Sequence, residues 1–163
     1  MVTRKFETEP SPLACGLYRT TKDLHINQEV VKANRLVFFH NHSQDGGAVI
    51  HLPQENIDNR WIFQSERHSI EHANEATLIP LRPEGLWWMS SHFHPDDEHV
   101  VDKDSLIQLG YNRNGKPILF FPQAIQGTNG FVFPNRGMQV PEKIYATLKP
   151  LSVRGPHIPP KLH

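Results

Sequence analysis

The sequence predicts an all-β protein in which one small barrel occurs twice. The first observation is a repeated phrase: residues 76–81 read ATLIPL, and residues 146–151 read ATLKPL, about 70 residues later. The second is that short β-prone runs precede both phrases in the same order. The third is composition, because 14 Pro and 10 Gly among 163 residues disfavour long helices. A repeat with this period indicates a tandem duplication.

The correspondence extends backwards from both phrases and pairs residues of similar kind. The pairs include Tyr18 with Trp87, Leu36 with Leu106, Val37 with Ile107, Ile50 with Leu119, and Phe63 with Phe133. We therefore expect a flexible lead at 1–15, one barrel at 16–81, a second at 82–151, and a Pro-rich tail at 152–163. Because a unit of this size buries little surface alone, we expect the two copies to pack against each other pseudo-symmetrically.

Each repeat is predicted to contain five short strands. In the first repeat they are 16–20, 36–40, 48–52, 60–63 and 77–81, and in the second 85–89, 105–109, 117–121, 130–133 and 147–151. A helical turn is expected within 69–75 and again at 144–145, before the last strand of each repeat. The run at 36–40 has apolar residues in both phases, which predicts cover on both faces. Asp45-Gly46 predicts a hairpin turn, Pro53 is expected to end a strand, and 21–29 reads as a polar loop.

This size and order of elements resembles SH3-type barrels. The resemblance is one of architecture and rests on the five short strands, the tight hairpin and the helical turn before the last strand. It implies a small half-open barrel in each repeat. Because the exposed edges of such barrels need protection, the sister copy is expected to cover them.

The charge composition gives no reason to expect a nucleic-acid or membrane partner. The chain has 17 Lys and Arg against 17 Asp and Glu, whereas phosphate binding rests mainly on Lys and Arg. No run approaches the roughly 20 apolar residues of a membrane helix. Cys15 is the only cysteine, so an intramolecular disulfide is excluded. These features favour a soluble, cytoplasmic protein.

The aromatic residues suggest where a ligand binds. Tyr18 and Trp87 are equivalent in the repeat, Trp88 adds a second large ring, and with Tyr111 they are the candidate ligand-binding residues. Alternation along a strand places Trp87 and Trp88 on opposite faces, so one is expected in a core and the other at the seam between repeats or exposed. The alternative is that these rings fill two small cores, and Trp61 is expected to do so.

The leading interpretation is a non-enzymatic binding or assembly protein. It would recognise an extended segment of a partner protein, or a second copy of itself through edge strands, at the aromatic surface or the inter-repeat seam. On this interpretation no cofactor is needed, and Trp88→Ala is expected to weaken partner capture without unfolding the protein.

The histidines suggest a second interpretation. The chain has 11 of them, and His92, His94 and Glu98 have the spacing His-x-His-x3-Glu, which resembles the first metal motif of the cupins. The resemblance implies a metal-dependent enzyme in which two imidazoles and a carboxylate hold a divalent ion such as Zn, Fe or Mn. The position for a further histidine holds Val140 instead. The alternative is an exposed polar loop between strands.

Overall fold

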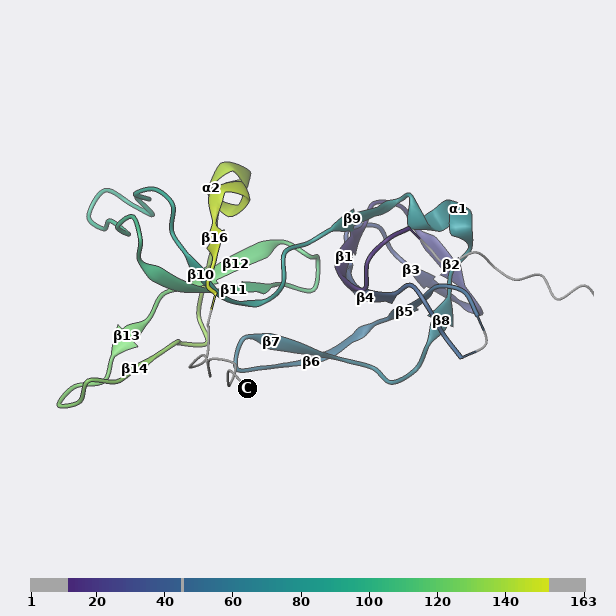
Figure 1. Ribbon diagram of the computed structural model, residues 1–163, viewed down its shortest axis with the longest axis horizontal. Coiled ribbons are helices and arrows are strands. Elements are labelled where there is room, and N and C mark those ends of the chain that lie inside the picture. The colour runs from purple at the N-terminus through teal and green to yellow at the C-terminus, as the bar shows by residue number, and fades with distance from the viewer. Residues whose placement is uncertain (1–11, 45, 153–163) are drawn as a thin grey trace, which may run out of the picture.

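The computed structural model describes residues 12–44 and 46–152, which form sheets and hairpins with two short helices (Figure 1). The all-β prediction is confirmed. Most of the predicted lead and tail, and Asp45 of the predicted turn, lie outside the described residues. Within the described ranges, no helix is both long and apolar enough to cross a membrane.

The first half contains a five-stranded antiparallel sheet of order β8-β5-β4-β1-β9. Its strands are β1 (Gly16–Thr20), β4 (Leu36–His40), β5 (Val49–His51), β8 (His68–Ser69) and β9 (Leu78–Pro80). Two hairpins and a helix connect them: β2 (Leu24–Ile26) with β3 (Glu29–Val31), β6 (Pro53–Ile57) with β7 (Arg60–Phe63), and α1 (His72–Glu75).

The second half contains another five-stranded antiparallel sheet, of order β15-β12-β11-β10-β16. Its strands are β10 (Gly85–Trp88), β11 (Leu106–Tyr111), β12 (Pro117–Phe120), β15 (Met138–Gln139) and β16 (Lys149–Pro150), accompanied by β13 (Gln123–Ala124), β14 (Phe131–Val132) and α2 (Glu142–Thr147). Counted along the chain within each sheet, both orders read 4-3-2-1-5. In the part of the chain that is described neither order closes on itself, so the predicted barrels are open sheets here.

One local prediction was wrong, and one strand was missed. The expected polar loop at 21–29 instead contains β2 and the start of β3, because Leu24 and Ile26 alternate with exposed His25 and bury their side chains. Pro53 follows the end of β5 but also begins β6, where the missing amide proton is tolerated at a first strand position. The strand β6 escaped prediction because most of its residues are polar and exposed.

The strand β4 is covered on both faces, as its sequence predicted. Val37 and Phe39 point into a cluster with Tyr18, Ile50 and Leu78, on one face of the first sheet. Leu36 and Phe38 point to the opposite face, because side chains alternate along a strand. Leu36, Val37 and Phe39 are 0% exposed, so neither face of β4 lies open to water along these residues.

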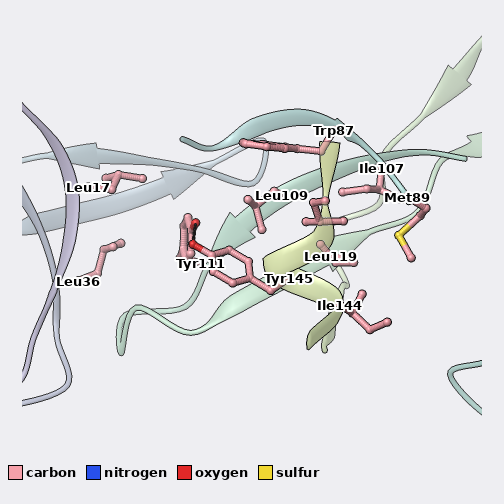
Figure 2. Packing of buried hydrophobic residues seen from close by; sticks show 11 residues of the cluster. Leu17, Leu36, Trp87, Met89, Ile107, Leu109, Tyr111, Leu119, Ile144 and Tyr145 are labelled. Carbon is pink, nitrogen blue, oxygen red and sulfur yellow. Dashed lines mark hydrogen bonds between the residues drawn. The ribbon is translucent and has the colours of Figure 1, made fainter. Parts of the chain in front are cut away.

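The two halves share a hydrophobic core, which was expected for units of this size. The cluster under the second sheet includes Trp87, Ile107 and Leu109, and it also takes in Leu17 and Leu36 from β1 and β4 (Figure 2). Burial of apolar area contributes about 25 cal/mol per Å². The junction between the halves is therefore stabilised by packing as well as by hydrogen bonds.

The hairpin β6–β7, here called the first arm, reaches from the first half onto the second sheet (Figure 1). At its tip the Asn59 side chain donates a hydrogen bond to Gln108 Oε1 at 2.9 Å, and Gln108 Nε2 donates to the Asp58 carbonyl at 3.1 Å. Both tip residues have positive φ, 51° for Asp58 and 66° for Asn59, a conformation that Asn and Asp tolerate better than most residues. The turn residues Asp58 and Asn59 thus hold the tip of the first arm against β11.

Candidate binding groove at the junction

An apolar groove of about 460 Å³ lies beside the first arm. Its walls come from the start of β1, from β4, from the first arm, and from the segment that links β9 to β10. We name it the junction groove. Its lining includes Leu17, Phe38, Trp61, Phe63, Leu81 and Glu84. This volume is in the range of small-molecule sites, which lie between roughly 300 and 1,000 Å³.

Trp61 fixes one wall of the junction groove. Its indole Nε1 donates a hydrogen bond to the Tyr111 carbonyl oxygen at 2.6 Å, which ties the first arm to the end of β11. The Arg113 guanidinium lies 4.9 Å from the ring centroid, in the geometry of a cation–π contact. The ring is half-buried, so it both holds the two halves together and presents apolar surface to the groove.

Glu84 is the carboxylate that lines the junction groove, and its pKa is raised. Its two carboxylate oxygens accept the Trp61 backbone N–H at 3.2 and 3.4 Å. Burial raises the pKa of Glu84 to about 7, while the Trp61 N–H and the nearby Arg60 act in the opposite direction. A carboxyl group that changes charge near neutral pH, in an apolar site, is a recognised sign of a binding or reactive position.

The residues before Glu84 are held by the second half. The Arg82 side chain donates to the Leu148 carbonyl at 2.5 Å and to the Ala146 carbonyl at 2.6 Å. Its guanidinium also lies 5.2 Å from the Trp87 ring and 5.5 Å from the Tyr145 ring. The linking segment is therefore fixed to the second half, and it carries the Glu84 carboxylate into the groove.

The structure separates the four predicted ligand-binding residues. Tyr18, Trp87 and Tyr111 are buried, and their polar atoms are bonded inside the protein: to the carbonyls of Ala14, Pro83 and Arg82, at 2.7, 3.0 and 2.6 Å. Burial raises the pKa of Tyr111 above its usual range. Tyr18 alone of the four lines the groove. Trp88 is half-buried, and alternation along β10 places it on the face opposite Trp87.

The sequence interpretation missed Glu84 and Phe63 and expected Trp61 in a core. All three take their role from contacts between segments far apart in the chain, such as the 50-residue separation between Trp61 and Tyr111. The available signal was the correspondence of Phe63 with Phe133, which marked the end of β7 as a repeated feature. No local pattern marks Glu84.

The three residues of the predicted metal motif are not brought together as a metal site. His92, His94 and Glu98 are all exposed, and His92 Nδ1 lies 3.2 Å from Asp102. Asp96 instead accepts the backbone N–H groups of Glu98 and His99 at 2.9 and 2.8 Å, which makes a local turn. Over residues 12–44 and 46–152 no three His, Cys, Asp or Glu side chains are grouped to hold a metal ion.

The pKa of Glu84 predicts a pH dependence of stability. The folded pKa, about 7, lies above the ordinary value of 4.5, so the folded state holds a proton that the unfolded chain releases between these values. Stability is therefore expected to fall as pH rises from 4.5 through 7. The expected loss is only about 1 kcal/mol, because solvent screens the charge of a partly exposed group. Denaturant unfolding between pH 4.5 and 8 measures this. Glu84→Gln should flatten that part of the profile, and an unchanged profile in the variant would contradict the assignment.

Comparison with protein-family models, with curated proteins and with solved structures finds no match to this chain. The function is therefore inferred from the geometry of the junction groove.

Proposed function

We propose that this chain is a non-enzymatic binding protein, built from two copies of one β unit, that holds an extended apolar segment of a partner protein in the junction groove. The observation that carries the proposal is the groove itself. Aromatic and aliphatic side chains line it, and Glu84 is its one carboxylate. Sites of this kind bind by burying apolar surface and use a few polar groups for orientation.

The position of the groove favours an extended segment. Two of the elements that line it are edge strands in the described part of the chain, where β9 ends the first sheet and β7 pairs only with β6. Edge strands can bind an extended chain through their free backbone groups, while pockets beside them select its side chains. Pro80, on β9, lacks an amide proton and so limits uncontrolled pairing along that edge.

Glu84 gives the site a chemical preference. Its carboxyl group is half neutral near pH 7, and the Arg60 side chain also lines the groove. A bound segment with a Lys or Arg next to its apolar residues would stabilise the ionised form of Glu84, and its own binding would gain from the charge pair. We therefore expect basic-apolar segments to bind better above pH 7 than at pH 5.

The proposal that two copies of one unit form the chain rests on sequence and topology together. The equivalent positions of the sequence fall on equivalent strands: Tyr18 on β1 and Trp87 on β10, Val37 on β4 and Ile107 on β11. Each of these four residues is buried in the core beneath its own sheet. Superposition of the two halves in a crystal structure tests this part of the proposal, and halves that differ in strand path would contradict it.

Selection of peptides from a random library, on the immobilised protein, tests the binding proposal. Cys15 is exposed, lines the groove and is the only cysteine, so its alkylation by N-ethylmaleimide reports on the site. We expect selected peptides to slow alkylation severalfold. Ala14→Trp, which places a large side chain at an exposed groove position, should abolish capture.

Trp88→Ala is the matched control, because it removes the half-buried ring from the surface that the sequence interpretation favoured. We expect capture by the Trp88→Ala protein to equal that of the wild type. Capture that survives Ala14→Trp but fails in Trp88→Ala would move the binding site from the junction groove to the Trp88 surface. Selection of no peptide at all would remove the binding function.

A further inference from the structure

The hairpin β13–β14 and the strands β5 and β8 lie at opposite ends of the molecule (Figure 1), and each end carries a surface that does not line the junction groove. One is the hairpin β13–β14, here called the second arm, on which Phe131 and Val132 are 52% and 51% exposed. The other is a hollow of about 520 Å³ on the first sheet, lined among others by His40, His51 and Ser65. We name it the histidine hollow.

The histidine hollow occupies the same place in the first sheet as the tip of the first arm does in the second. In the first sheet His51 of the hollow lies opposite Phe38, and Phe38 lies opposite Leu17; Phe38 and Leu17 themselves line the adjoining junction groove. In the second sheet Leu86, Gln108 and Phe120 lie opposite one another in the same register. Two residues further along these strands, His40 of β4 pairs with Val49, and Gly110 of β11 pairs with Ile118. His40 thus corresponds to Gly110.

In the second sheet the tip of the first arm covers the corresponding place. The Asn59 side chain bonds to Gln108 and, at 3.0 Å, to the Pro134 carbonyl. The Asn59 carbonyl lies so close to Gly110 that a Cβ there would be 2.9 Å from it. Gln108, Gly110 and Phe120 are buried as a result, whereas Phe38, His40 and His51 in the first sheet remain partly exposed.

The second arm corresponds to the first in position and sequence. Each arm follows the third strand of its sheet, β5 or β12. Residues 59–63 of the first arm read NRWIF, and residues 129–133 of the second read NGFVF. Asn129 thus stands where the first arm has the docking residue Asn59, and Phe131 stands where it has Trp61.

Surfaces that the junction buries in one half are exposed in the other. Leu17 is 8% exposed, and its counterpart Leu86 is 38% exposed. Leu36 is 0% exposed, while Leu106 is only partly buried. This is the pattern of a head-to-tail interface that the chain forms once internally, with a donor surface open at one end and an acceptor surface open at the other.

We propose that the second arm of one copy docks in the histidine hollow of a second copy, so that the protein associates with itself head to tail. This inference rests on the proposed two-copy architecture and not on the junction groove. The arm and the hollow lie at opposite ends of the molecule, so the contact joins different copies. A heterologous contact of this kind produces a ring if its rotation closes and a filament if it does not.

Sedimentation equilibrium of the full chain at increasing concentration tests the proposal. The wild type should form dimers and larger species. Phe131→Glu, which charges the arm, and Ser65→Trp, which fills the hollow at an exposed position, should each weaken association at least tenfold. Val100→Glu is the matched control, because Val100 is 51% exposed outside both surfaces, and it should associate like the wild type. Thermal unfolding by circular dichroism shows whether each variant is folded.

Mixing the two variants is the decisive experiment. The Phe131→Glu protein keeps its hollow and the Ser65→Trp protein keeps its arm, so an equimolar mixture should form a heterodimer and nothing larger. A wild type that stays monomeric at every concentration, or variants that fail to complement each other, would overturn the proposal. Peptide capture by the wild type is measured separately, so a wild type that captures peptide but does not associate with itself overturns this inference alone.

Discussion

Trp61→Ala is expected to destabilise the protein by about 3 kcal/mol, the low end for truncation of a large aromatic side chain because the ring is half-buried. The substitution removes the hydrogen bond to the Tyr111 carbonyl, the contact with Arg113 and the packing against the shared core. The free energy of unfolding, from denaturant titration, measures the loss.

Two companion variants identify the cause. Trp61→Phe keeps a ring but lacks the indole donor, and it should cost about 1 kcal/mol, the net value of one hydrogen bond. Ile62→Ala, at the next position of β7, is 43% exposed and should cost less than about 0.5 kcal/mol. If Trp61→Ala were no more destabilising than Ile62→Ala, the first arm would not hold the two halves together.

Gly110→Ala should have the second large effect, a loss of about 1–3 kcal/mol from overpacking. An added Cβ would lie 2.9 Å from the Asn59 carbonyl oxygen and 3.0 Å from the Phe120 ring. The Asn59 backbone has little room to move, since its turn has positive φ and its side chain is already bonded to Gln108. The arm should therefore lift from the second sheet.

Hydrogen exchange of the amides at 54–63 is the measurement for this variant, and it should speed up across the first arm. Gly130→Ala is the matched control on the second arm, where the nearest atom to an added Cβ is Thr128 Oγ1 at 3.3 Å, at an exposed site. Its cost should stay within about 0.5 kcal/mol. Unchanged protection of the arm in Gly110→Ala would mean that its tip does not rest on β11.

Strands with a strong local pattern could be predicted from the sequence alone. The runs at 16–20, 36–40 and 60–63 coincide with β1, β4 and β7 because apolar and β-branched residues are concentrated there. β6 was missed because most of its residues are polar, and its pairing with β7 and its hydrogen bonds from Arg113 are not visible in the local sequence. Short edge strands such as β8 and β15 exist through pairing with a neighbour, and that information is not local.

The candidate site was less predictable than the fold. Large aromatic residues suggested a binding surface, yet Tyr18, Trp87 and Tyr111 proved to be buried with internally bonded polar atoms. The groove arises where the first arm meets the segment that carries Glu84, and the repeat indicated only that a seam exists. The His-x-His-x3-Glu spacing predicted a grouping that an exposed loop does not form, because Asp96 organises that loop as a local turn.

The three tryptophans allow the most direct test of the binding proposal. In a nuclear magnetic resonance spectrum each indole N–H gives its own signal, and Trp61, Trp87 and Trp88 lie in the groove wall, in the core and on the outer surface of β10. On titration with a library-selected peptide, we expect the Trp61 signal to shift in proportion to binding while that of Trp88 stays in place. A shift of Trp88 with an unmoved Trp61 signal would contradict the proposed site.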